Sequence, residues 1–317
     1  MINEYVVKLV DNLPDQFKNN RHPIIYDIVL DGGAFNGSYH IGCLYFLKEM
    51  EKRNYIKIDR ISGTSIGSVA GVLYFCDSLD EFFILYNNIS QQFRKAYNLN
   101  IINDFKSLMI DKLTKNDYYK KISKKLFITY YNIVKGKKRI KSVYKDIDDI
   151  IDTIIRSMYI PYLIDGNMIY KNKYVDGITP YIFSIKNNKI NNKINNKINK
   201  KILYLDLHGY NKITELFCIT NEKTNYHRVL SGLLDIHSFF IKQSNTSMCS
   251  FVNEWSYLHK CHINAKLLCE KIIVYIIYAF LYLKKNVPSK YTNNILYKLL
   301  SAFTYDIYEL IIQECCI

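Results

Sequence analysis

Residues 24–67 read IIYDIVLDGGAFNGSYHIGCLYFLKEMEKRNYIKIDRISGTSIG, and the spacing of their apolar residues changes twice. IIYDIVL and YIKIDRIS are short apolar runs of the kind that form buried strands, whereas apolar residues between them recur at helical spacing. This order predicts a right-handed strand–helix–strand unit with two parallel strands. Neighbouring parallel strands end at the same edge of a sheet, so the glycine-rich loop 31–37 and the turn 63–67 should lie side by side there.

The remaining pattern extends this α/β arrangement. We expect helices over 68–76, 79–125 and 146–158, a hairpin of strands 126–134 and 139–144, and strands over 167–177 and 201–209. Residues 187–200 repeat N-N-K-I with period four, which is typical of a solvated loop insertion. From residue 212 the pattern is helical, with helices over 226–243, 263–284 and 290–316. The sequence therefore predicts three αβα layers around a mostly parallel sheet, plus a helical carboxy-terminal region.

Positive charge is concentrated in two segments of this 317-residue chain, whose formal net charge is +14. Residues 112–145 hold twelve Lys or Arg and one acid, Asp117, and residues 186–201 hold six Lys and no acid. Such segments attract phosphate, on nucleic acid or on anionic lipid. No nucleic-acid-binding motif accompanies them, so we expect no specific nucleic-acid partner. Solvated loop lysines are an equally good interpretation.

Targeting signals are also missing from the amino-terminal sequence. MINEYVVKLVDNLPDQF lacks the apolar core of a secretory signal, and the longest apolar run, 272–283, is shorter than the ~20 residues that cross a bilayer. That run predicts a buried or interfacial helix. We therefore expect a protein that is cytoplasmic or peripheral to a membrane.

The eight cysteines form no CxxC pair. Cys249, Cys261, His262 and Cys269 are close in sequence, but without such a pair they favour ordinary helix cysteines over zinc ligands. The expected chemistry uses no metal and no cofactor.

GTSIG at 63–67 places Ser65 between Gly63 and Gly67, at the junction of a predicted strand and a predicted helix. This is the pattern of a nucleophile elbow, in which small neighbours let the serine stand exposed in a tight turn. On the neighbouring strand, Gly32, Gly33 and Ala34 could turn backbone N–H groups toward a developing oxyanion. A phosphate-binding loop is the alternative, but GxGxxG and the P-loop Lys are both absent.

The base that would activate Ser65 is less defined by local sequence. Asp176, in YVDGITP, ends a predicted strand and could complete a Ser–Asp–His set with His208, His227 or His237. None of these histidines lies in a recognisable motif. A direct Ser–Asp dyad is the competing arrangement.

The chain resembles the patatin-like phospholipases. The resemblance rests on LDGGAFNGSYHIG at 30–42, GTSIG at 63–67, SMYIP at 157–161 and DGI at 176–178, which occur in the family's order over roughly residues 24–207. It implies a patatin-like fold and a lipid acyl hydrolase with a Ser65–Asp176 dyad and an oxyanion hole at Gly32, Gly33 and Ala34. The expected domains are an amino-terminal extension 1–23, a catalytic domain 24–211 and a helical region 212–317.

Three residues depart from the family pattern. Ala34 replaces the third glycine of the oxyanion loop, Asn36 replaces its usual basic residue, and Ile178 replaces Gly or Ala. Ala34 keeps its N–H available if its backbone does not need a positive φ.

Phospholipase A or lysophospholipase-like hydrolysis of an acyl lipid is the expected activity, with segments 112–145 and 186–201 docking on an anionic membrane. Two alternatives remain: a Ser–Asp–His esterase of the α/β-hydrolase type, and a catalytically silent lipid-binding protein on the same scaffold.

Overall fold

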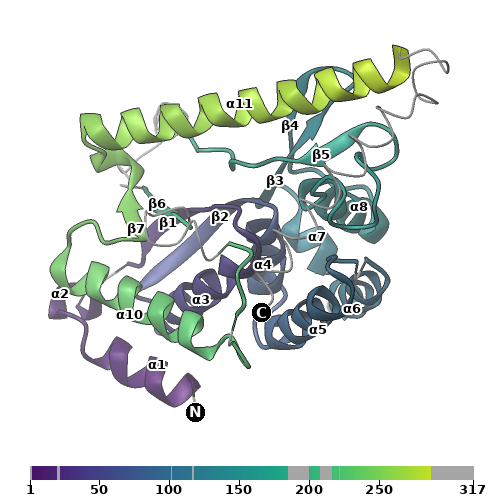
Figure 1. The fold of residues 1–317 in the computed structure, drawn as a ribbon. Helices are drawn as coiled ribbons and strands as arrows, with labels where there is room; N and C mark the ends of the chain where they lie inside the picture. The colour runs from purple at the N-terminus through teal and green to yellow at the C-terminus, as the bar shows by residue number, and fades with distance from the viewer. Residues whose placement is uncertain are drawn as a thin grey trace.

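A computed structural model of the chain describes residues 2–19, 22–100, 102–115, 118–184, 200–207, 216–220 and 222–286. Its centre is a seven-stranded sheet with the order β4-β3-β2-β1-β6-β7, and β5 also pairs with β3 (Figure 1). The four central strands are parallel, namely β1 (Ile24–Leu30), β2 (Ile56–Thr64), β3 (Leu126–Asn132) and β6 (Lys201–Leu205). The antiparallel strands are β4 (Lys137–Lys141), β5 (Tyr174–Asp176) and β7 (Cys249–Phe251). The predicted α/β class with a mostly parallel central sheet is confirmed.

The helices follow the predicted order. They are α1 (Ile2–Asp11), α2 (Asp15–Lys18), α3 (Gly37–Lys52), α4 (Ile66–Phe75), α5 (Glu81–Ala96), α6 (Ile102–Thr114), α7 (Tyr118–Ile122), α8 (Ile147–Ser157), α10 (Tyr226–Lys242) and α11 (Tyr257–Asn286). Short 3-10 helices lie at Ala34–Asn36 and Val252–Glu254. The expected strand–helix–strand unit is β1–α3–β2, and its parallel pairing is confirmed.

Alternation along the strands creates two apolar faces. In β6, Leu203 and Leu205 point into the main core with α3, α4 and α10, whereas Ile202 and Tyr204 point to the opposite face. Helix α11 packs against that opposite face, with Ile263 among the residues that it buries there. Figure 1 shows α11 alone on one side of the sheet and α3, α4 and α10 on the other. The predicted three αβα layers are therefore present.

Two expectations about strands were wrong. The region from 212 was expected to be entirely helical, but β7 lies within it and extends the sheet by pairing with β6. A three-residue strand is too short to show the alternation of apolar and polar residues that identifies a strand in a sequence. Such a strand is recognised only by its pairing with a neighbouring strand. The strand expected over 167–177 is limited to β5, because residues 161–173 are turns and one bridge between Tyr170 and Tyr174. The predicted helix 290–316 and most of the repeat 187–200 lie outside the described residues.

Candidate active site

Ser65 occupies a sharp turn between β2 and α4, with φ 50° and ψ −128°. A non-glycine residue at positive φ is strained, so the surrounding chain must hold it there. A Cβ on Gly63 would approach the backbone of Gly67 to 2.6 Å, and a Cβ on Gly67 would approach the carbonyl oxygens of Leu30 and Asp31 equally closely. Both glycines are therefore required by close backbone packing, as a nucleophile elbow needs.

Ser157, at the end of α8, holds the elbow from the side. Its hydroxyl accepts a hydrogen bond from the Ser65 N–H (2.9 Å) and donates one to the Thr129 carbonyl of β3 (2.6 Å). Ser157 is completely buried. The Ser65 backbone is thus tied to two further elements, although Ser157 lies 92 residues away in sequence.

The pairing of β3 explains how Asp176 reaches Ser65. One edge of β3 pairs with β4 over residues 128–132. The other edge pairs first with β2, up to Thr64 opposite Thr129, and then with β5, from Asp176 opposite Tyr130. Strands β2 and β5 therefore meet end to end along one edge of β3. Ser65 directly follows Thr64, so this register places it next to Asp176.

Ser65 and Asp176 line one cavity, and the carboxylate of Asp176 has an unusual pKa. Burial raises the pKa of Asp176 to about 6, while hydrogen bonds from the Ile178 N–H and the Ser65 hydroxyl oppose that rise. The Ile178 N–H lies 2.9 Å from Asp176 Oδ1, and it fixes the orientation of the carboxylate. A carboxylate whose pKa is raised by burial, and which has no ion-pair partner among the described residues, is suited to accept a proton near neutral pH.

The loop after β1 faces this pair. Gly32, Gly33 and Ala34 line the same cavity as Ser65 and Asp176. However, the Gly32 N–H donates to Asp31 Oδ1 (3.1 Å), so it is already engaged. Among the described residues, no hydrogen bond involves the N–H groups of Gly33 and Ala34.

Ala34 adopts a positive φ, although an alanine would fit this loop without strain only if its φ were negative. Its φ is 41°, in the left-handed region that favours glycine. The alanine that replaces glycine is therefore strained, although its N–H stays unused by the rest of the fold. Ile178 is in the same situation, with φ 57° and a β-branched side chain.

The contacts of Asn36 explain why an uncharged residue can occupy a position where the family usually has a basic one. Its side-chain oxygen accepts a hydrogen bond from Arg228 of α10, which is completely buried and paired with Glu222. A guanidinium from a distant helix thus reaches the place where the family usually has a basic side chain in the loop. No local sequence signal marks Arg228, because the contact spans 192 residues.

Two cavities meet at Ser65. The larger has a volume of about 310 Å³ and is lined by Asp176, by the loop after β1, and by Ile273 and Ile277 of α11. The smaller, of about 70 Å³, has almost wholly apolar walls contributed by α4, α5 and α6. Ser65 therefore lies between a site that contains the polar groups and an apolar recess.

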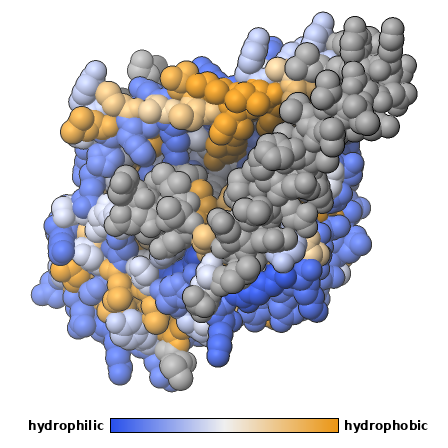
Figure 2. Space-filling view, viewed as in Figure 1, coloured by the Kyte–Doolittle hydropathy of each residue, from blue (hydrophilic) through white to orange (hydrophobic). Residues whose placement is uncertain are grey.

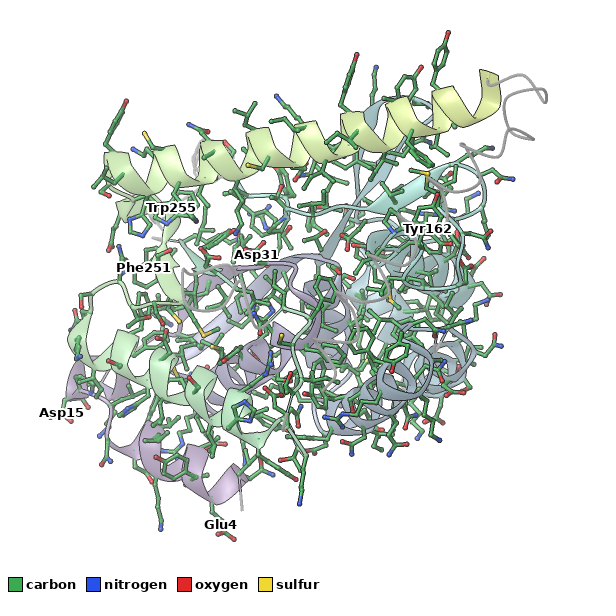
Figure 3. All side chains as sticks on the ribbon, viewed as in Figure 1. Glu4, Asp15, Asp31, Tyr162, Phe251 and Trp255 are labelled. Carbon is green, nitrogen blue, oxygen red and sulfur yellow. The ribbon has the colours of Figure 1, made fainter. Side chains whose placement is uncertain are left out.

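Ion pairs of two α11 residues, Lys266 and Glu270, fasten the helix over this edge of the sheet. Lys266 pairs with Asp31, which directly precedes Gly32, and with Asp206 after β6 (3.1 Å). Burial alone would lower the pKa of Lys266, but the two carboxylates outweigh it and raise that pKa. Figure 3 shows Asp31 in the interior, beneath α11, with Trp255 near the start of that helix.

Glu270 forms the second attachment. It pairs with Lys138 of β4 (2.9 Å) and accepts a hydrogen bond from the Thr179 N–H (3.0 Å), three residues after Asp176. Burial lowers the pKa of Lys138 despite this partner. Local sequence does not mark Lys266 or Glu270 as supports of the site, since isolated charged residues within a helix form no motif.

The histidines of the alternative triad lie elsewhere. His227 approaches Glu222 (3.3 Å), and His237 packs against Phe46 with its pKa lowered by burial. Neither lines a cavity that contains Ser65. His208 lies outside the described residues.

Several cations of the basic segments are neutralised within the fold. Lys112 pairs with Glu81, Lys141 with Asp149, and Lys200 with Asp27 and Asp59. The segment 112–145 is therefore not one uniform basic patch, and part of its charge serves internal packing.

No helix among the described residues combines the length and the apolar character needed to cross a bilayer. A search of curated proteins found no match to this chain. The patatin-like phospholipase family model matches residues 28–179, a range that runs from β1 to just past Asp176 and includes Ser65 and the glycine-rich loop after β1. These residues of the chain therefore form a domain of the patatin-like phospholipase family.

Proposed function

We propose that the protein is a lipid acyl hydrolase that cleaves fatty acyl esters through a Ser65–Asp176 dyad. The observation that carries this proposal is the placement of Ser65, in a strained elbow, beside Asp176 at the junction of β2 and β5 on β3, where both residues line one cavity. A serine in such an elbow, with a carboxylate of raised pKa beside it and apolar space on one side, matches the general hydrolase chemistry of the family.

The first step would form an acyl-enzyme. Asp176 accepts the Ser65 proton while Oγ attacks the ester carbonyl, and the N–H groups of Gly33 and Ala34 donate to the resulting oxyanion. In analogous sites one such donor contributes roughly 3–4 kcal/mol to transition-state stabilisation. The Gly32 N–H would join them only by leaving Asp31. Collapse of the tetrahedral intermediate transfers the proton from Asp176 to the departing alcohol.

The second step would release the fatty acid. Asp176, again ionised, removes a proton from water, and the hydroxide attacks the acyl carbonyl. Ser65 leaves with that proton, which restores the starting state. Every step of this two-stage reaction uses groups of the protein and one water molecule.

The cavities suggest how a lipid would lie. The apolar recess under Ser65 would receive the start of the acyl chain, and the larger cavity beside Asp176 would hold the alcohol part of a phospholipid or lysophospholipid. We further propose a cytoplasmic or membrane-peripheral location, with segments 112–145 and 186–201 favouring anionic membranes. The division into residues 1–23, 24–211 and 212–317 likewise stays a proposal.

A fluorophosphonate probe tests the nucleophile. Wild-type protein should be labelled on Ser65, and the label should disappear in Ser65→Ala but persist in Ser107→Ala, which changes an exposed serine of α6. An unlabelled wild type would favour the catalytically silent lipid-binding alternative, which the strain at Ala34 and the engaged Gly32 N–H support. Loss of labelling in His208→Ala, His227→Ala or His237→Ala would favour the Ser–Asp–His esterase.

A further inference from the structure

Helix α11 exposes an unusually apolar face. Ten of the 22 exposed large hydrophobic side chains among the described residues belong to it: Tyr257, Leu258, Leu268, Ile272, Ile273, Tyr275, Ile276, Tyr278, Phe280 and Tyr282. Ile272 and Ile276 are 51% and 61% exposed, and Tyr275 is 72% exposed. Figure 2 shows this hydrophobic band along the helix. A contiguous apolar surface of this kind marks an interaction site.

The charged side chains of α11 are divided between its buried side and its exposed side. Within the described side chains of the helix, the only acid is Glu270, and it is buried against Lys138. Lys266 likewise points inward to Asp31. The exposed cations Lys260 and Lys271 are eleven residues apart, which places them on one flank of the apolar stripe. An apolar stripe flanked by lysine and tyrosine is the pattern of a helix that lies in a membrane interface.

The neighbouring β3–β4 hairpin adds positive charge. Tyr131 and Ile133 of this hairpin pack against Val274 of α11, so the two elements are joined. Lys135 at its tip is exposed and forms no ion pair with any described residue, whereas Lys137 and Arg139 lie on the face of β4 opposite Lys138 and point away from α11. Anionic headgroups would complement Lys135 together with Lys260 and Lys271 of the helix.

The same helix also borders the candidate active site. Ile273 is 44% exposed at the surface, yet it lines the larger cavity together with Ile277, Ser65 and Asp176. An apolar molecule on the outside of α11 therefore has a short route along Ile273 to the proposed nucleophile.

We propose that the outward face of α11, together with Lys260 and Lys271 on its flank and Lys135 at the hairpin tip, is a docking surface for an anionic phospholipid bilayer. The helix lies in the plane of the interface, about 45 Å long at its usual rise per residue, with Leu268, Ile272 and Ile276 inserted among the acyl chains. The purpose of this docking, delivery of a lipid ester to Ser65, rests on the proposed function. The docking itself does not.

Vesicle co-sedimentation of the full chain tests the surface. The docking variant carries Leu268→Ser, Ile272→Ser and Ile276→Ser, which are four residues apart on one stripe. The matched control carries Ile84→Ser, Ile110→Ser and Leu234→Ser, which change similarly exposed apolar residues on α5, α6 and α10. Both are compared with wild type on vesicles of phosphatidylcholine alone and of phosphatidylcholine with phosphatidylserine, at low and high salt.

Wild type and control should bind the anionic vesicles, and the docking variant should bind at least tenfold more weakly. A second variant, Lys135→Gln with Lys260→Gln and Lys271→Gln, should lose the preference for phosphatidylserine and most of the salt dependence. Wild type that fails to sediment, or a docking variant that binds like wild type, would overturn the assignment. A wild-type dimer that the docking variant converts to monomers, without vesicle binding, would assign the face to a second copy and also overturn it.

Binding and hydrolysis separate this inference from the proposed function. Sedimentation needs no turnover and can be repeated with Ser65→Ala, so an inactive protein that binds vesicles refutes only the hydrolase proposal. In an active protein, the docking variant should lower the ratio of vesicle hydrolysis to short-chain ester hydrolysis at least tenfold. An unchanged ratio would overturn the docking assignment and leave the dyad intact.

Discussion

The ionisation of Asp176 sets the pH range in which the dyad can work. As the base, this carboxylate must be deprotonated, and its pKa is raised to about 6. We predict that kcat/KM for a soluble short-chain ester is constant above about pH 7 and falls tenfold per pH unit below about pH 5. A histidine base would produce a similar fall of kcat/KM at low pH, so the profile is compared with those of His227→Ala and His237→Ala. If either substitution abolished this fall, the assignment of the base to Asp176 would be contradicted.

The same pKa shift has a consequence for stability. Because folding raises the pKa of Asp176 from 3.8 to about 6, the folded state favours the protonated carboxyl, and stability is lost as pH rises through this interval. At pH 8 the ionised group costs about 3 kcal/mol relative to the unfolded chain.

Asp176→Asn removes that cost while it keeps an oxygen for the Ile178 N–H. We expect the variant to be more stable than wild type at pH 8, by up to about 3 kcal/mol, and to lose this advantage near pH 4. Urea unfolding at both pH values measures it, with the exposed Asp148→Asn as control. Equal gains at both pH values would show that ionisation is not the cause.

At the scale of secondary-structure elements, the elbow is held by the junction of β2, β3 and α8. Ser157 contributes the hydroxyl that links the Ser65 N–H to the Thr129 carbonyl. We predict that Ser157→Ala costs about 1–3 kcal/mol of stability, because it leaves a buried N–H without its partner.

The Ser157 variant should also lower kcat with little change in KM, since it affects the position of Ser65 more than substrate binding. Chemical denaturation and steady-state kinetics measure the two effects, and Ser107→Ala provides the exposed-serine control. A Ser157→Ala protein with wild-type kcat would show that the elbow does not depend on this contact.

Local sequence predicted the elements that carry the site because their constraints are local. Gly63 and Gly67 must be glycine for lack of space, and a five-residue motif records that need. Ser157, Arg228 and Lys266 support the site from other parts of the chain, through contacts that no local pattern encodes. The unfavourable φ of Ala34 was also invisible, since a sequence gives no backbone angle at a substituted glycine.

At the scale of the whole molecule, the β1–α3–β2 unit gave the sheet and its direction, and thereby the edge where the site lies. The position of α11 could not be predicted in the same way. Its apolar run indicated a helix, but only tertiary contacts show that one narrow face packs on the sheet while the wider apolar face stays exposed. Strand β7 joins the sheet from the region expected to be helical, for which its three residues gave no periodic signal.

The central claim, a Ser65–Asp176 acyl hydrolase, is tested most directly by fatty-acid release from a panel of phospholipids and lysophospholipids. Wild type is compared with Ser65→Ala and Asp176→Ala, with circular dichroism to verify the fold and Ser107→Ala as control. We predict that wild type and control release fatty acid and that both dyad variants lose at least a thousandfold in kcat, in line with the loss of a residue that acts as part of a catalytic unit. Full activity in either dyad variant, or no release by wild type from any ester, would contradict the account.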